Sequence, residues 1–133
     1  MCVFCEIIKG NLPCHKVYED EKFLAFLSIG PVNPGHTLVV PKEHYQYLEE
    51  VPEDDLKNLL LICRKIGGLL KLILGNKDYN LTLNNGPDAG QTVPHLHFHV
   101  IPRHEGDGHL EWPSSEYVPG EAEKIAESLR EKL

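Results

Sequence analysis

The chain has 133 residues, 41% of them hydrophobic and 25% charged, which is typical of one globular domain and excludes a disordered or collagen-like chain. Lys and Arg number 13 against 20 Asp and Glu, so the net charge of −7 argues against binding extended nucleic acid, although a few local donors can still hold one nucleotide. No apolar run reaches the ~18 residues of a membrane span, and the N-terminus lacks a signal-peptide pattern, so we expect a cytoplasmic protein without a membrane partner.

The first third of the chain predicts a short helix and three strands. The stretch VFCEII favours a helix close to the N-terminus, and HKVYED and KFLAFLSI are typical of two strands around the turn EDE. After the Pro/Gly loop PVNPGH, the apolar and β-branched stretch HTLVVPK predicts a buried strand that ends at Pro41.

One long helix is predicted over residues 52–74. Pro52 and the three acidic residues after it suit a helix start. Its leucines and isoleucines form a stripe wider than one face of a helix. Such a helix is either buried deep in a single domain or shared between the core and a dimer interface. The second interpretation suits a domain this small, so we expect a homodimer.

The last part predicts two more strands and an amphipathic helix. YNLTLN and PHLHFHVIP are expected to pair as a hairpin across the loop NGPDAGQT, and residues 120–133 carry apolar side chains at helical spacing. The predicted fold class is therefore α+β: about five strands in a mostly antiparallel sheet, with a short N-terminal helix, one long helix and a C-terminal helix.

Three histidines alternate within the predicted last strand. His95, His97 and His99 would share one face, while Leu96, Phe98 and Val100 would face the core. The row is either a half-exposed polar face or a chemical site, since imidazole serves as a metal ligand, nucleophile or acid–base group. Positions 95 and 99 lie about 13 Å apart along a strand, which disfavours a single zinc held by the row alone.

The loop before the row also has two interpretations. Gly86, Gly90 and Gln91 could leave backbone amides free to approach a phosphate, but NNGPDAGQ is equally compatible with an ordinary turn.

Taken with their surroundings, these motifs resemble the histidine triad (HIT) family of nucleotide-binding hydrolases and transferases. HLHFHVI carries the His-x-His-x-His signature, and NNGPDAGQTVPHLHFHVIPR, PGHTLVVPKEH and CVFCEII resemble further family blocks. The resemblance covers about residues 2–103 of one expected domain, 1–133, and leaves 104–133 as a C-terminal extension. It implies the HIT-like fold.

The resemblance implies a role for individual residues. His97 corresponds to the nucleophile, which attacks the α-phosphorus and forms a covalent nucleotidyl-histidine intermediate. His99 corresponds to the histidine that contacts the α-phosphate. His36 corresponds to the histidine that supports the histidine row from the neighbouring strand. His95 is the first member of that row. The implied nucleotide contacts are Phe4, Ile7 and Ile29 for the base, Ser28 for the ribose, and Asn84, Gly90, Gln91 and Thr92 for the phosphates.

Zinc is implied by the same comparison. Microbial members with an N-terminal C-x-x-C suggest the ligand set Cys2, Cys5, His44 and His95, whose chemistry is that of structural zinc. The alternative is that the two cysteines are free thiols. Cys14 and Cys63 have no place in this set, and Cys63 is expected in the core. The remaining histidines, His15, His104 and His109, are expected on the surface or in loops.

The expected function is hydrolysis at the α-phosphate of a purine nucleotide, either a dinucleoside polyphosphate or a nucleoside phosphoramidate. A nucleotide-binding interaction module with residual turnover is the alternative, and catalytic zinc at the row is a third hypothesis. One position departs from the family: many members carry Asp or Asn where this chain has Ser28, so ribose binding is expected to be weaker. The segment EWPSSEY matches no family element.

Overall fold

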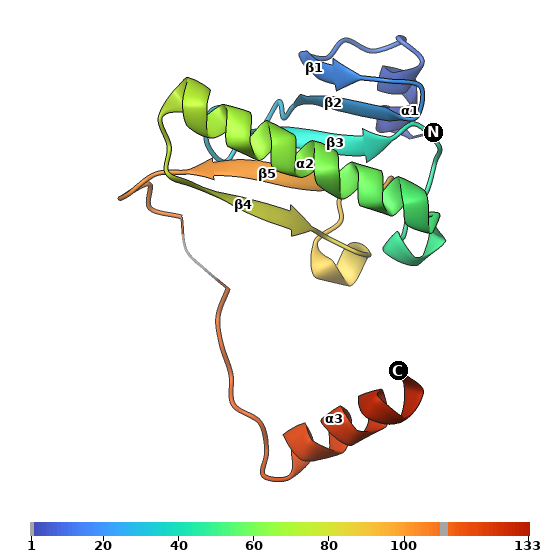
Figure 1. The fold of residues 1–133 in the computed structure, drawn as a ribbon, viewed down its shortest axis with the longest axis vertical. Helices are drawn as coiled ribbons and strands as arrows, with labels where there is room; N and C mark the ends of the chain where they lie inside the picture. Colours follow the sequence, from blue (N-terminus) through green and yellow to red (C-terminus); the bar gives the residue numbers. More distant parts are fainter. Residues whose placement is uncertain (1, 110–111) are drawn as a thin grey trace.

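A five-stranded antiparallel sheet in the order β1-β2-β3-β5-β4 forms the body of the protein (Figure 1). The computed structural model describes residues 2–109 and 112–133, so Met1, Leu110 and Glu111, the first residue of EWPSSEY, lie outside the described residues. The strands are β1 (Lys16–Glu19), β2 (Phe23–Leu27), β3 (Thr37–Pro41), β4 (Asp78–Leu83) and β5 (Phe98–Arg103). The helices are α1 (Val3–Ile8), α2 (Glu53–Leu74) and α3 (Glu121–Lys132), and two 3-10 turns cover Leu48–Glu50 and Pro87–Ala89. The predicted α+β class is confirmed.

The sheet buries both faces of its central strands. Side chains alternate along a strand, so Ala25 and Val39 face α2, whereas Leu24 and Val40 face α1. The cluster beneath α2 also contains Leu96 and Val100, as the sequence pattern predicted.

The long helix α2 begins and ends as predicted. Pro52 is its N-cap, acidic residues occupy its first turn, and Gly75 ends it in the left-handed conformation at φ 74°. Within the helix, Gly67 faces the ring of Tyr79 on β4 so closely that a methyl group in place of its hydrogen would overlap the ring. Close packing of α2 against the sheet therefore depends on the missing side chain at this position.

The predicted strand over residues 94–102 is wrong at its start. β5 begins at Phe98, so His95 and His97 precede the ladder. Pro94 has no N–H to donate, and the amides of His95 and Leu96 bond to Val93 and Tyr45 instead of a neighbouring strand. β4 ends at this level, since its last residue Leu83 pairs with Phe98, whereas β3 continues past Val39, the other partner of Phe98, to Pro41.

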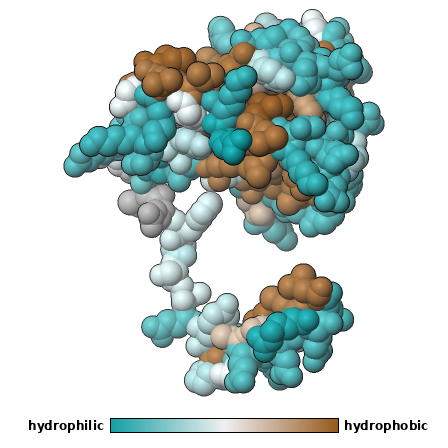
Figure 2. All heavy atoms as spheres, in the orientation of Figure 1, coloured by the Kyte–Doolittle hydropathy of each residue, from teal (hydrophilic) through white to brown (hydrophobic). Residues whose placement is uncertain are grey.

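The C-terminal helix α3 stands apart from the sheet at the end of an extended segment (Figure 1). Its apolar residues Ile125 and Leu129 are 47% and 57% exposed. Apolar surface also gathers over the body of the protein and on α3 (Figure 2). Among residues 2–109 and 112–133, no helix combines the length and apolar character needed to cross a bilayer.

Candidate active site and metal centre

His97 is held in one tautomer by its own backbone. Its Nδ1 lies 2.7 Å from the carbonyl oxygen of His95, and a carbonyl can only accept, so Nδ1 carries the proton. The other ring nitrogen, Nε2, then holds a lone pair. Burial lowers the pKa of His97, which keeps the ring neutral at neutral pH. A neutral imidazole with a free Nε2 has the form that a nucleophile requires.

A second hydrogen-bonded chain fixes His99 in the opposite tautomer. The backbone N–H of Val32 donates to Nδ1 of His36 at 3.1 Å, so the proton of neutral His36 sits on Nε2. That Nε2 lies 2.9 Å from Nδ1 of His99 and donates to it, which leaves the proton of His99 on its own Nε2. His99 can therefore present an N–H donor, the group that binds a phosphate oxygen.

Burial keeps both of these rings uncharged. Burial, followed by the charges of His97 and His36, lowers the pKa of His99 to about 4. The pKa of His36 is lowered by burial and then by the charge of His97. The neutral tautomers derived above are thus the forms present at neutral pH.

A cavity of about 720 Å³ opens beside these rings. His36, His99 and Asn84 line it, which brings three of the sequence-predicted site residues together. His97 lies behind the lining, with its ring centroid 4.8 Å from that of His99. The remaining wall is formed by residues of β4, β5 and the following segment: Asn80, Thr82, Ile101, Arg103, His109 and Trp112, with Val32 from the β2–β3 loop.

Side-chain hydrogen bonds hold the predicted phosphate loop in place. The side-chain carbonyl of Gln91 accepts from the N–H of Gly86 at 3.1 Å, and its amide donates to the carbonyl of Gln46 at 3.0 Å. Asn84 donates to the carbonyl of Gly90 at 3.2 Å. Thr92 is exposed. Gln91 thus braces the loop in this structure, and its phosphate contact stays a prediction.

The residues expected around the base and ribose are spread along the chain. Phe4 is buried, with Ile7 packed against its cluster, and its ring meets His97 edge-on at 5.1 Å between centroids. Ile29, by contrast, is 97% exposed. The hydroxyl of Ser28 accepts from the N–H of Gly30 at 3.3 Å.

The four predicted zinc ligands meet in one cluster. The ligand atoms of Cys2, Cys5, His44 and His95 all lie within 4.8 Å of one another. Sγ of Cys5 lies 3.3 Å from Nδ1 of His44 and 3.5 Å from Nδ1 of His95, and Sγ of Cys2 is also 3.5 Å from His95. A tetrahedral zinc bound at ~2.3 Å to sulfur and ~2.05 Å to nitrogen separates such pairs by about 3.6 Å. The cluster therefore fits a tetrahedral zinc ion.

A second bond prepares His95 as a ligand. Its Nε2 donates to the carbonyl of Pro41 at 2.8 Å, which leaves the lone pair on Nδ1, the atom that faces both thiols. Burial and the neighbouring Cys2 raise the pKa of Cys5. As predicted, Cys14 and Cys63 lie outside the cluster, and Cys63 is in the core.

The sequence did not predict the wall of the cavity that His109 and Trp112 form. His109 was expected on the surface, and it is exposed, but together with Trp112 it lines the same cavity as His99. Arg103 and Asp107, which hold this wall, were not singled out. The clustered Gly106, Asp107 and Gly108 predict only a tight turn, so no local signal pointed to a role at the site.

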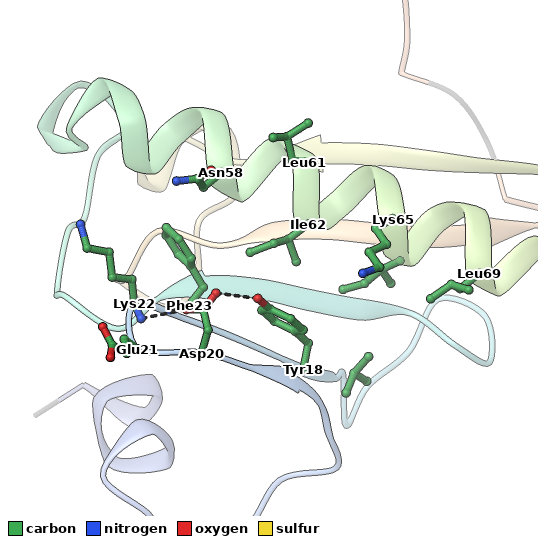
Figure 3. Close-up of a pocket in the computed structure, with 12 residues that line it drawn as sticks. Tyr18, Asp20, Glu21, Lys22, Phe23, Asn58, Leu61, Ile62, Lys65 and Leu69 are labelled. Carbon is green, nitrogen blue, oxygen red and sulfur yellow. Dashed lines mark hydrogen bonds between the residues drawn. The ribbon is translucent and has the colours of Figure 1, made fainter.

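Another hollow, of about 650 Å³, lies between α2 and the β1–β2 hairpin (Figure 3). Ile62 and Leu69 of α2 lie on the side of the helix toward Tyr18 and Phe23 (Figure 3). Neither histidine nor cysteine is among the described residues that line it. It offers apolar surface rather than the groups that phosphoryl transfer requires.

Comparison with known proteins matches most of the chain. The sequence pattern of the HIT domain matches residues 9–106. An uncharacterized HIT-like protein of Methanocaldococcus jannaschii is 54% identical over 83% of this chain and 84% of its own. The adenosine 5'-monophosphoramidase hnt1 of Schizosaccharomyces pombe is 37% identical over 99% and 98% of the two chains.

Two solved structures match almost the whole chain. A HIT family protein of Bacillus subtilis, 39% identical, aligns with a TM-score of 0.88 over 99% of this chain and 96% of its own. A zinc-bound histidine triad family protein of Mycobacterium smegmatis, 34% identical, aligns with a TM-score of 0.77 over 99% and 97%.

Proposed function

Since this chain belongs to the HIT domain family, we propose that it is a nucleotide hydrolase that cleaves at the α-phosphate through a nucleotidyl-histidine intermediate on His97. The observation that carries the proposal is the pair of opposite tautomers: a free Nε2 lone pair on His97 beside an Nε2–H donor on His99. A relative named as an adenosine 5'-monophosphoramidase supports adenosine phosphoramidates as the substrate class. Dinucleoside polyphosphates are the second class in the proposal.

The chemistry divides into two displacements. The lone pair on Nε2 of His97 forms a bond to the α-phosphorus, while the phosphorus–nitrogen bond breaks and the amine leaves with a proton from water. Water then attacks the same phosphorus, the histidine–phosphorus bond breaks, and the nucleoside monophosphate departs. In both steps His99 donates from Nε2 to a phosphate oxygen, and His36 holds that donor in place.

We propose zinc for the Cys2, Cys5, His44 and His95 cluster. All four protein ligands of a tetrahedral ion are present, which leaves no position for substrate, so the zinc supplies stability rather than chemistry. The ion would tie α1 and the segment around His44 to His95, two residues before the nucleophile. Zinc in the Mycobacterium smegmatis structure supports the same proposal.

Acid quenching followed by mass spectrometry tests the mechanism. Incubation with an adenosine phosphoramidate is expected to add one adenylyl group to the peptide that contains His97, and His97→Ala should lose both the adduct and turnover. Full turnover by His97→Ala would contradict the proposal. If wild-type rates stay within tenfold of His97→Ala while nucleotides still bind, the protein is an interaction module instead.

We propose that the protein is a homodimer. α2 leaves Leu60, Leu69, Leu72 and Ile73 between 46% and 82% exposed, and α3 exposes its own apolar stripe. Apolar surface over this extent is costly in water and is typical of an interface. Sedimentation equilibrium should give twice the mass of the chain, whereas a monomer at micromolar concentration would contradict the proposal.

A further inference from the structure

The carboxylate of Asp107 gathers an unusual number of donors. It accepts from Nε and Nη2 of Arg103 at 2.8 and 2.9 Å, which is a bidentate pair. It also accepts from the backbone amides of His104 and His109, both at 3.1 Å, and from the side chain of Asn33 at 3.0 Å. Only 9% of its side chain is exposed.

These bonds join three separate parts of the chain. Arg103 also donates to Asn80 on β4 and to the carbonyl of His109, each within 2.9 Å. Asn33, in the loop that leads to His36, also donates to the carbonyl of Pro102 on β5. The Asp107 carboxylate therefore fixes the turn 104–109 to the sheet and to the loop that carries His36.

This turn forms one wall of the candidate active site. His109, at its end, and Trp112, three residues further, line the same cavity as His36 and His99. His36, His99 and Asn84 give the cavity polar groups, and Trp112, Val32 and Ile101 give it apolar surface. A substrate with its phosphate at the histidines would direct either its nucleoside or its leaving group toward His109 and Trp112. The base is already expected near Phe4, in the cluster around α1, so the wall is left for the leaving group.

We propose that Asp107 is a positioning residue that holds this wall and thereby sets the affinity for substrates with a bulky apolar leaving group. The inference rests on the proposed hydrolase function. Asp107 itself touches no reacting atom: it acts through Arg103, Asn33 and the backbone of His109, which lines the cavity together with Trp112.

Two adenosine phosphoramidates test the proposal, one that releases ammonia and one that releases phenethylamine. Asp107→Asn keeps the shape of the side chain but removes the charge that binds Arg103. It should raise KM for the phenethylamine substrate about tenfold, raise KM for the ammonia substrate less than twofold, and change kcat little for either. Asn33→Ala, which removes one of the five bonds, should give the same selectivity with a smaller effect. Glu19→Gln is the matched control, since it breaks ion pairs with Lys16 on β1 and with Lys42, just after β3, and none of these residues lines the cavity.

The single tryptophan of the chain gives a second measurement that requires binding but no turnover. In the wild type, the phenethylamine substrate should protect Trp112 from quenching by acrylamide, and Asp107→Asn should lose at least half of that protection. Equal KM increases for both substrates, or unchanged protection in Asp107→Asn, would overturn the proposal. If Asp107→Asn does not fold, Asn33→Ala decides by the same two criteria.

Failure of the proposed function can be told apart from failure of this inference. Protection of Trp112 without turnover in the wild type would contradict the hydrolase function but support the role of the wall. Turnover without protection would support the hydrolase function but overturn the role of Asp107.

Discussion

Nε2 of His36 lies 2.9 Å from Nδ1 of His99, and the two rings belong to segments 63 positions apart in the chain. Because Val32 donates to the other nitrogen of His36, the direction of this bond is fixed: His36 donates and His99 accepts. His36 therefore determines which nitrogen of His99 carries the proton.

Replacing His36 should impair catalysis more than it impairs folding. His36→Ala removes the donor, so His99 can adopt either tautomer and its ring is no longer held in one orientation. The kcat/KM for an adenosine phosphoramidate should therefore fall about tenfold, which corresponds to ~1.4 kcal/mol. His15→Ala, at an exposed histidine, is the control and should have no effect. Long-range ¹H–¹⁵N spectra should show the Nε2–H tautomer of His99 in the wild type. An Nδ1–H signal there would contradict the proposed chain of bonds.

The low pKa of His99 predicts how stability depends on pH. Its folded-state pKa of about 4 lies below the unfolded value, so the unfolded chain binds more protons between these two values. The free energy of unfolding should thus fall as pH drops from about 6.5 toward 4, and His99 should account for at most about 3 kcal/mol of the loss. Urea unfolding of wild type and His99→Asn at several pH values isolates the contribution of His99 to the pH dependence, because the other titrating groups are common to both proteins. If the free energy of unfolding depends on pH in the same way in both proteins, His99 makes no such contribution.

The sequence predicted the elements well where local chemistry decides their limits. Pro52 precedes α2 and Pro41 ends β3 because proline fixes its own φ and has no N–H, and Gly75 ends α2 because glycine readily adopts the left-handed conformation. The start of β5 could not be predicted in this way. The alternating pattern runs on through His95 and His97, but β4 ends at Leu83, and the amides of His95 and Leu96 bond to Val93 and Tyr45 rather than to the part of β3 that continues to Pro41.

The same distinction holds for the site. The four predicted zinc ligands and the His36–His99 pair follow motifs that the resemblance named, and the structure brings the members of each set together. The cavity wall that contains His109 depends on bonds from Asn33 and Arg103 to Asp107. Asn33 is far from Asp107 in the sequence, and the turn around Asp107 carries no distinctive motif. Contacts of this kind arise from tertiary packing, so they cannot be predicted from any single stretch of the sequence.

Loss of one zinc ligand should lower both metal content and stability. Cys5→Ser removes a thiolate that lies within 3.5 Å of both histidine ligands, so zinc by mass spectrometry should fall from one ion per chain to well below one. The melting temperature should drop by several degrees, and chelation of wild-type protein should reproduce the drop. Cys14→Ser, at a partly buried cysteine outside the cluster, should retain the metal. Equal zinc content in both variants would rule out this ligand set.

Adjacent glycines in α2 should respond in opposite directions to the same substitution. Gly67→Ala forces a methyl group against the ring of Tyr79, so the free energy of unfolding should fall by about 1–3 kcal/mol. Gly68 has open space around it, so Gly68→Ala should stabilise the helix by about 0.5–1 kcal/mol. Chemical denaturation measures both changes. Similar values for the two variants would mean that Tyr79 moves aside without cost.

Ser28 offers a test of ribose recognition. Its hydroxyl is short and already accepts from the N–H of Gly30, so it can contribute only a weak contact to a ribose hydroxyl. A carboxylate at this position reaches further and forms charge-assisted bonds, so Ser28→Asp should lower KM for an adenosine phosphoramidate about fivefold. The 2′,3′-dideoxy analogue lacks the hydroxyls and should show no such gain. The ratio of the two KM values therefore isolates the ribose contact, and an equal change for both substrates would place Ser28 away from the ribose.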